Sequence, residues 1–270
     1  MILGEIKARI NQGYRTIKFP DVEPDLPERF RGMPKMNCKN FDCKKCKEAC
    51  PTGAISIAGA ARDTGATQGA GTIRQLKLDM GRCIFCTDCV LACPEKAISF
   101  TRDYGLSAND RDDLILKNGQ VFEPANALKK ETLRIFGRSL KLRQVSAGGC
   151  NACEMDTQVL STVVFDLERF GIQFVASPRH ADGLLITGPV TESMRLALEK
   201  TYEAVPNPKI VIAVGACAIS GGLYAGHDEV AKSGATEIFP VDLYIPGCPP
   251  HPITILDGLL RLIGKRWSHA

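Results

Sequence analysis

Short runs of β-forming residues alternate with longer, helix-length segments through the second half of the chain. We expect strands at residues 143–147, 172–176, 183–187, 209–215 and 243–246, and helices at about 156–170, 191–202 and 251–262. Strands and helices that alternate in this order are typical of a parallel sheet with crossover helices. The pattern therefore predicts an α/β domain, a flavodoxin-like, doubly wound parallel sheet.

The first half of the chain contains an internal repeat, in which each copy has four cysteines, a helical turn and a short strand. The first copy reads CKNFDCKKCKEACP from Cys38 and is followed by AISI at 54–57. The second reads CIFCTDCVLACP from Cys83 and is followed by AISF at 97–100. Residues 58–71, between the copies, are rich in Gly, Ala and Thr, as loose surface loops are. We expect an α+β, ferredoxin-like domain here.

These two halves meet in a charged stretch that contains no cysteine. We expect the ferredoxin-like domain at 1–112, a connector at 113–140 with one short helix near 125–136, and the sheet domain at 141–270. The connector contains a basic run that begins at Lys129. A solvated face is the simplest interpretation of this run, and docking against another subunit is the alternative.

Composition excludes several classes of protein. The chain has 270 residues, enough for about two domains, and its 44% of hydrophobic residues can build a core. The net charge is only +4, which argues against nucleic-acid binding. No apolar run approaches the roughly 20 residues of a membrane-spanning helix. The first residues lack both a secretory apolar stretch and a twin-arginine motif, so we expect a cytoplasmic location.

The chain contains 12 cysteines, and this number points to metal chemistry. A disulfide framework is not expected in a chain of this length without an export signal. Eight of the cysteines lie between Cys38 and Cys93, and four lie between Cys150 and Cys248. Reduced thiols grouped in this way typically bind metal.

The second copy of the repeat has the Cys-x2-Cys-x2-Cys-x3-Cys-Pro spacing of bacterial ferredoxins. Thiolates at two-residue gaps curl around one four-iron cube, and the fourth thiolate ligates the other cluster. This crossed ligation predicts two [4Fe-4S] clusters. One has the ligands Cys38, Cys43, Cys46 and Cys93, and the other has Cys83, Cys86, Cys89 and Cys50.

The first copy departs from this pattern, because its opening gap from Cys38 to Cys43 is two residues longer. The loop between them must therefore bulge, and a three-iron or labile cluster is an alternative on that side. A structural zinc site is the alternative for the repeat as a whole. Three lysines beside the first cluster, Lys44, Lys45 and Lys47, are expected to favour its reduced state.

The four remaining cysteines all follow predicted strands. Cys150 and Cys153 come after the first strand of the sheet, and Cys217 and Cys248 come after the fourth and fifth. Loops at the carboxyl ends of parallel strands converge at one edge of the sheet, where cofactors bind. Four converging thiolates predict a third [4Fe-4S] cluster, on Cys150, Cys153, Cys217 and Cys248. The alternative is a Cys-x2-Cys zinc or redox pair with two buried free cysteines.

Five motifs surround these cysteines: GGCNACE at 148–154, SPRHAD at 177–182, TGPVT at 187–191, GAC at 215–217 and PGCPP at 246–250. As a set they resemble the small subunit of energy-converting, membrane-associated nickel–iron hydrogenases of the formate hydrogenlyase type. The related subunit of respiratory complex I, which holds the terminal cluster, usually has adjacent cysteines at the first position, whereas Cys150 and Cys153 are separated by two residues. Residues 30–104 are similar to the two-cluster ferredoxin subunit of the same complexes.

This resemblance implies an iron–sulfur electron-transfer subunit of a hydrogenase complex that reduces protons or oxidises H2. The third cluster would lie beside a nickel–iron site in a partner large subunit, and no catalytic residue is expected in this chain. Membrane-arm subunits would hold it on the cytoplasmic face of the inner membrane. Its electron donor or acceptor would be a ferredoxin, a formate dehydrogenase or a CO dehydrogenase module. The alternatives are a complex I-like quinone oxidoreductase subunit that carries the terminal cluster, and a soluble carrier without an enzyme partner.

Three other residues have two interpretations each. Glu154 follows Cys153 and is expected to interact with a helix dipole, with a proton relay or a subunit contact as the alternative. His251 is expected to be a surface histidine at a helix start, with hydrogen bonding to a cluster as the alternative. His180 is a surface residue that faces a partner in the alternative interpretation.

Overall fold

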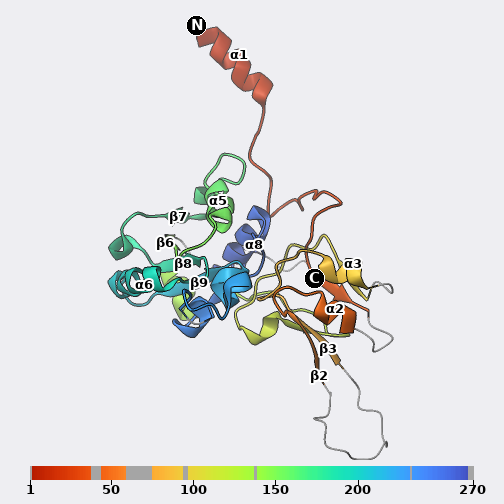
Figure 1. The fold of residues 1–270 in the computed structure, drawn as a ribbon. Helices are drawn as coiled ribbons and strands as arrows, with labels where there is room; N and C mark the ends of the chain where they lie inside the picture. Colours follow the sequence, from red (N-terminus) through yellow and green to blue (C-terminus); the bar gives the residue numbers. More distant parts are fainter. Residues whose placement is uncertain are drawn as a thin grey trace, which may run out of the picture.

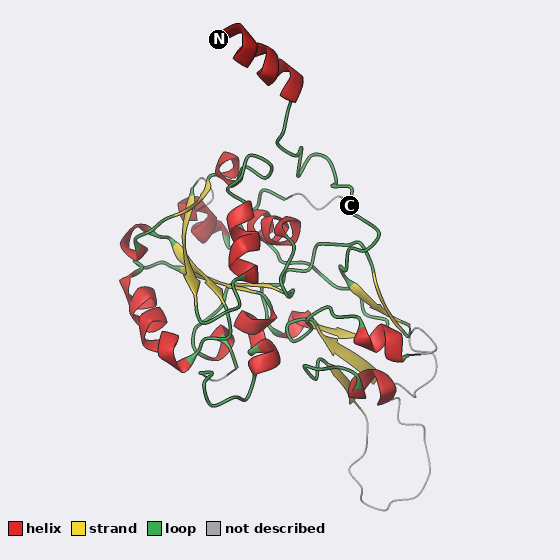
Figure 2. Cartoon of the chain, turned by 45° about the horizontal axis from the view of Figure 1, so that its top comes forward, coloured by secondary structure: helices red, strands yellow, loops and turns green. Residues whose placement is uncertain are grey.

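The computed structural model describes residues 2–37, 44–58, 75–93, 97–136, 139–231 and 233–266. These residues form two packed units with separate sheets, shown in Figure 1 and, from a second direction, in Figure 2. The smaller unit contains the cysteine repeat, and the larger unit contains the last four cysteines.

Five parallel strands form the sheet of the larger unit, in the order β10-β9-β8-β6-β7. The strands are β6 (Leu140–Ser146), β7 (Ile172–Phe174), β8 (Gly183–Thr187), β9 (Ile210–Val214) and β10 (Leu243–Ile245). All five expected strands are therefore confirmed, with ends within three residues of the expected ones. The two central strands β8 and β9 are almost entirely apolar and buried along their whole length, because both faces of the sheet are covered.

Helices cover both faces of this sheet (Figure 2). On one face, Leu185 and Ile212 pack in a cluster with Leu256 of α8 (Pro252–Leu262), which also contacts α5 (Ala152–Val159). On the other face, Leu184 packs in a cluster with Leu198 of α6 (Glu192–Ala204). Successive strand residues thus contribute to opposite cores, as expected of a pleated strand buried on both sides.

The predicted helix at 156–170 was wrong in its extent. The structure has α5 over Ala152–Val159 and then a separate 3-10 turn, η2, over Leu167–Phe170. The segment between them contains Thr162, Val163 and Val164, and β-branched side chains lose rotamer freedom in a helix. The chain folds back there, so that the Leu167 amide donates to the Leu160 carbonyl at 3.0 Å.

The smaller unit has two antiparallel sheets and two short helices. β1 (Pro34–Met36) pairs with β4 (Ile98–Phe100), and β3 (Gln75–Asp79) lies between β2 (Ile55–Ala58) and β5 (Ile115–Lys117). The expected helical turns are α2 (Lys44–Glu48) and α3 (Asp88–Ala92), each followed along the chain by one of the expected strands. The repeat in the sequence is therefore a structural repeat as well.

Part of the expected connector belongs to this smaller unit. After the 3-10 turn η1 (Asp112–Leu114), β5 pairs with β3, with Leu116 opposite Leu78. The helix expected near 125–136 is shorter, α4 (Lys130–Phe136). The segment between β5 and α4 is fixed at two points. The Ala125 amide donates to the Ser107 carbonyl at 2.7 Å, and the Leu128 amide donates to the Leu262 carbonyl at 3.0 Å.

Direct hydrogen bonds join the two units. Ala108 and Tyr244 form an antiparallel bridge at the β10 edge of the parallel sheet. Ser220, at the end of α7 (Ala216–Ser220), donates to the Gly81 carbonyl at 2.9 Å. Tyr244 also belongs to the apolar core of the smaller unit. The two units therefore share one continuous packed interface.

The first helix, α1 (Ile2–Gln12), extends away from the two units (Figure 1). Within the described residues, no helix combines the length and the apolar character needed to cross a bilayer.

Candidate metal centres

The cysteines of the second copy meet one cysteine of the first. Burial, together with the charge of Cys50, raises the pKa of the Cys83 thiol to about 12 and that of Cys89 to about 11. Cys50 and Cys86 line the same small cavity as these two thiols, against an apolar wall that includes Leu78. The structure thus brings together the four predicted ligands Cys50, Cys83, Cys86 and Cys89.

Backbone geometry around this group suits an iron–sulfur cluster. Phe85 (φ 55°) and Thr87 (φ 73°) both have left-handed conformations, which are uncommon outside glycine. Alternation with right-handed residues turns successive N–H groups inward, and such concave nests hold anionic groups, including iron–sulfur clusters. The Phe85 amide donates to Cys83 Sγ at 3.4 Å, and the Ala54 amide donates to Cys50 Sγ at 3.3 Å. These bonds would stabilise ligating thiolates.

Cys46 of the first copy lies beside Cys93 of the second. Burial, together with the neighbouring Cys93 thiol, raises the pKa of Cys46 to about 12. The Ala97 amide donates to Cys93 Sγ at 3.4 Å, matching the bond that Ala54 makes to Cys50. The other two predicted ligands of this site, Cys38 and Cys43, lie outside the described residues.

The last four cysteines converge at the carboxyl edge of the parallel sheet. Burial, together with Cys248 and Cys150, raises the pKa of Cys217 to about 11. Burial also raises the pKa of Cys153, with contributions from the three other thiols. The four residues come from the segments that follow β6, β9 and β10, with Cys153 in the first turn of α5 and Cys217 in the first turn of α7, as expected from their positions after strands.

Glycines and left-handed residues shape this third group. A Cβ atom on Gly215 would lie 2.6 Å from Cys153 Sγ, and one on Gly222 would lie 2.9 Å from Cys217 Sγ. Asn151, between the first two cysteines, has φ 71°. The backbone therefore approaches the sulfurs as closely as it can, which leaves the space between the thiols for a cofactor.

All three thiol groups share an electrostatic property. Buried, crowded thiols resist ionisation, and metal ligation requires thiolates, so the donor sets need a compensating positive charge. No three His, Cys, Asp or Glu side chains of the described residues meet closely enough to bind a single metal ion. A four-iron cube is larger than one ion and its four thiolates stand further apart, so the second and third groups, whose four thiols are all described, fit such a cluster.

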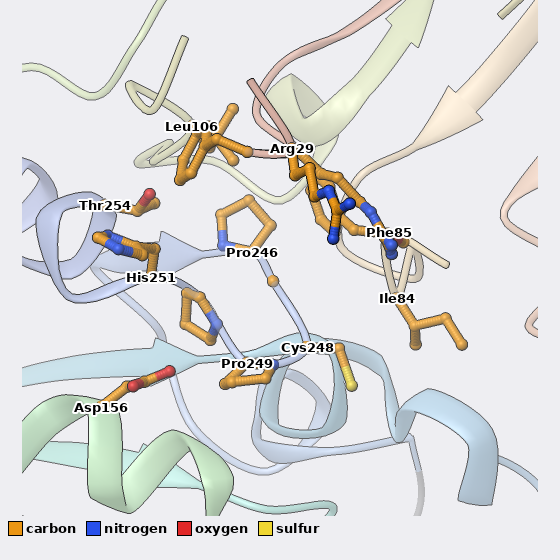
Figure 3. Close-up of a pocket in the computed structure, with 14 residues that line it drawn as sticks. Arg29, Ile84, Phe85, Leu106, Asp156, Pro246, Cys248, Pro249, His251 and Thr254 are labelled. Atoms are coloured by element: carbon orange, nitrogen blue, oxygen red, sulfur yellow. The ribbon is translucent and has the colours of Figure 1, made fainter. Parts of the chain in front are cut away.

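The second and third groups lie next to each other across the interface between the units. Cys248 and Cys86 are close enough for the charge of Cys86 to raise the pKa of Cys248, after burial and Cys150. Ile84, Phe85 and Cys248 line one pocket between the units (Figure 3). Arg31 donates to the Phe85 carbonyl at 2.8 Å and so fixes the cysteine loop at this interface. Sequence reasoning missed Arg31, because the contact spans 54 residues.

Glu154 lies deep beside the third group. Its Oε1 accepts hydrogen bonds from Ser146 Oγ and Thr187 Oγ1, both at 2.6 Å, and only 5% of the residue is exposed. Ser146 and Thr187 end two adjacent strands, so the sheet edge itself binds the carboxylate. The negative charge of Glu154 raises the pKa of both Cys153 and Cys217. The two hydroxyl partners were not predicted from the sequence.

The two histidines considered in the sequence, His251 and His180, have different environments. His251 is the N-cap of α8, where its Nδ1 accepts from the Ile253 amide at 3.2 Å, and it lines the pocket beside Cys248 (Figure 3). Burial lowers the pKa of His251, and the carboxylate of Asp156 opposes this shift. His180 is exposed in a 3-10 turn, η3 (Pro178–His180).

Comparison with known proteins agrees with this arrangement. Residues 37–97 match the family described as a 4Fe-4S dicluster domain, and residues 150–262 match the family described as NADH ubiquinone oxidoreductase, 20 Kd subunit. The larger unit thus has the fold and cysteines of an oxidoreductase subunit, preceded by a dicluster domain. The chain belongs to the NADH ubiquinone oxidoreductase 20 Kd subunit family.

Relatives in this family include subunits of two kinds of enzyme. Formate hydrogenlyase subunit 7 of Escherichia coli is 45% identical over 53% of this chain and 56% of its own length. The probable membrane-bound hydrogenase subunit mbhJ of Pyrococcus furiosus is 42% identical over 49% of this chain and 78% of its own. An NADH-quinone oxidoreductase subunit of Citrifermentans bemidjiense is 46% identical over 43% of this chain and 68% of its own.

Proposed function

We propose that this chain is the iron–sulfur electron-transfer subunit of a membrane-associated nickel–iron hydrogenase complex. The observation that carries the proposal is the series of three thiol groups, in which Cys46 and Cys93 come first, the Cys86 group second and the Cys248 group third. The complex would reduce protons or oxidise H2 at a nickel–iron site in a partner large subunit, with this chain conducting the electrons.

Three [4Fe-4S] clusters would occupy these groups. When bound, the clusters supply one-electron redox chemistry. The first would be held by Cys38, Cys43, Cys46 and Cys93, the second by Cys50, Cys83, Cys86 and Cys89, and the third by Cys150, Cys153, Cys217 and Cys248. The proximity of Cys46 to Cys93, and of Cys50 to the second copy, supports crossed ligation.

The protein around the clusters has a defined task. Backbone N–H groups donate to the sulfurs, the apolar walls exclude water, and Glu154 sets a negative charge beside the third group. These factors determine the potentials of iron–sulfur clusters. Electrons would pass between the second and third clusters across the Cys86–Cys248 interface.

The architecture proposed for the two units follows from their strand orders. Counted within its own unit, the parallel sheet has the order 2-1-3-4-5, which is the flavodoxin-like order, and cofactors bind at the carboxyl edge of such sheets. The smaller unit would be ferredoxin-like, because each cysteine loop leads into a short helix and a strand. Since β5 pairs within the smaller unit, we place the boundary between β5 and β6.

A partner subunit would cover the third cluster. Cys150 and Cys248 are exposed in this chain, and exposed apolar side chains follow Cys153 and Cys217 in sequence: Met155, Leu223 and Tyr224. Large exposed apolar residues beside a cofactor edge are typical of a protein interface. The nickel–iron large subunit is the proposed occupant, and membrane-arm subunits would hold the complex at the cytoplasmic face of the inner membrane.

A quinone oxidoreductase of the complex I type is the second candidate function, because relatives of that kind match as well as the hydrogenase subunits do. Sequence identity to these relatives therefore does not distinguish the hydrogenase function from the quinone oxidoreductase function. The Cys150-x2-Cys153 spacing favours the hydrogenase, since complex I subunits usually have adjacent cysteines at this position.

The experiment that separates these functions is a metal assay on the complex purified anaerobically through a tag on this chain. We expect nickel together with iron, and H2-dependent reduction of a viologen dye. Iron without nickel, combined with quinone-dependent activity, would transfer the chain to the quinone oxidoreductases.

A further inference from the structure

Three lysines cover the outer side of the first cysteine group. Lys44, Lys45 and Lys47 are exposed on α2, whereas Cys46 of the same helix is buried. With about 3.6 residues per turn, the lysines span an arc of about 160° and Cys46 lies opposite the middle of that arc. The helix therefore holds the thiol with its inner face and presents ammonium groups with its outer face.

The described residues do not neutralise these ammonium groups. Within the described part of the chain, none of the three lysines takes part in an ion pair. Lys35 on β1 is exposed as well, and the exposed carboxylates on the two neighbouring helices are Glu48 and Asp88. Among the described residues of these elements, positive charge thus exceeds negative charge.

An apolar side chain lies on the adjoining helix. Leu91, in the last turn of α3, is 83% exposed, and α3 packs against α2, as Figure 1 shows. Leu91 is also two residues before Cys93, which lies beside Cys46. An apolar residue with charged neighbours, next to a redox centre, is the composition of a weak, electrostatically guided protein interface.

We propose that α2 and α3 form the docking surface for a small acidic one-electron carrier protein. The docking surface is defined by Lys44, Lys45, Lys47 and Leu91. It rests on the proposed function, and it assigns electron exchange with the mobile carrier to the first cluster. The carboxylates of the carrier would pair with the lysines, and one electron would pass between the carrier and the first cluster. The third cluster lies on the other unit, so the two ends of the series serve different partners.

Charge complementarity selects this occupant. A carrier that must bind, exchange one electron and leave needs fast association and weak affinity, and opposite surface charges provide both. Lysines suit this task because they are flexible, hydrated point charges that are easily screened by salt. A permanently bound subunit would instead be expected to bury a larger apolar surface.

Binding of an acidic bacterial ferredoxin to the purified holocomplex tests the proposal. Both proteins are kept oxidised, so that the measured Kd is independent of cluster potentials. The test variant is K44E/K45E/K47E. The matched control reverses three charges on and beside α4, as K129E/K130E/R134E, because these residues are also exposed and α4 adjoins the C-terminal end of the larger unit.

We expect the docking-surface variant to weaken ferredoxin binding at least about tenfold at low salt and to lose most of its salt dependence. The control should keep the wild-type Kd, and viologen-driven H2 formation should persist in both variants. An unchanged Kd in the docking-surface variant would overturn the proposal, as would equal weakening in the control. Binding of anionic lipid vesicles in place of ferredoxin would also overturn it.

The test is separate from that of the proposed function. A wild-type complex that lacks nickel contradicts the hydrogenase assignment, whatever the ferredoxin affinity. A nickel-containing complex whose ferredoxin binding ignores Lys44, Lys45 and Lys47 contradicts only the docking surface.

Discussion

At the residue scale, the thiols are placed by close backbone approaches. Left-handed residues curve the loops between cysteines, and glycines allow the neighbouring backbone to reach the sulfurs. This local geometry makes the assignment of individual ligands testable by single substitutions.

Cys50 of the first copy should ligate the second cluster, and Cys93 of the second copy should ligate the first cluster. We expect C50S to remove the same electron paramagnetic resonance signal as C83S, and C93S to remove the same signal as C46S, because each fourth thiol lies with the other copy. Spectra of the dithionite-reduced variants provide the measurement. If C50S and C46S lost the same signal, the crossed ligation would be wrong.

Gly215 should be intolerant of even one methyl group. G215A places a Cβ atom 2.6 Å from Cys153 Sγ, so we expect the chain to lose the third cluster, about four iron atoms. G226A is the matched control, since Gly226 has a similar φ of 84° but no atom near its Cβ position. Iron analysis of both variants decides, and equal iron contents would refute the steric argument.

Glu154 should lower the potential of the third cluster. E154Q keeps an oxygen that accepts from Ser146 and Thr187 but removes the negative charge beside Cys153. The midpoint potential of the third cluster should therefore rise, while those of the other two clusters stay constant. A redox titration that shows no change, or an equal change in all three, would assign Glu154 a purely structural role.

At the element scale, α8 joins three parts of the molecule through one buried carboxylate. Asp257 is fully buried and accepts from Arg261 Nε at 2.7 Å and from Arg266 Nε at 3.0 Å. Arg266 also donates to Glu23 Oε1 at 2.6 Å and to the Tyr104 hydroxyl at 2.9 Å. The N-terminal segment, the smaller unit and the end of the chain are thus connected at this helix.

Removal of that carboxylate should be costly. D257N leaves the largely buried Arg261 guanidinium without its counter-charge and leaves Arg266 with Glu23 alone, so we expect a loss of about 3–5 kcal/mol of unfolding free energy. Anaerobic denaturant titration of the holo chain measures this change in the free energy of unfolding. E203Q breaks an exposed pair with Lys200 and should leave the transition unchanged. Equal midpoints for D257N and E203Q would contradict the structural role of Asp257.

Elements with local signals were predictable from the sequence, and elements that depend on distant partners were not. The strand at 183–187 has a continuous apolar run, and its limits were predicted correctly. The sequence contains no such signal for the pairing of β5 with β3. β5 has only three residues, and its pairing register is set by a strand 36 or more residues earlier in the chain. The end of α5 was missed because the apolar spacing continued through residues that disfavour a helix.

The same distinction applies to the metal centres. Cysteine spacing and positions after strands predicted which thiols would be neighbours in the second and third groups. The juxtaposition of Cys86 and Cys248 depends on packing between the units, through contacts such as Ser220 with Gly81. The hydroxyl partners of Glu154 were hidden because they depend on the pairing of β6 with β8.

At the scale of the whole molecule, one chain combines a dicluster unit and a sheet unit that carry adjacent metal centres. Their interface is held by the Ala108–Tyr244 bridge and by the hydrogen bond from Ser220 to the Gly81 carbonyl, and Arg31 fixes the loop that contains Cys86. A covalent and packed connection would keep the proposed second and third clusters at a constant separation, which electron tunnelling requires. The series would then act as a single conductor between the proposed carrier and the proposed large subunit.

The most direct test of this account is H2 reduction of the isolated complex, followed by low-temperature electron paramagnetic resonance. We predict that H2 alone reduces all three [4Fe-4S] clusters, with magnetic coupling between the second and third. Clusters that stay oxidised under H2 but are reduced by a quinol would contradict the account.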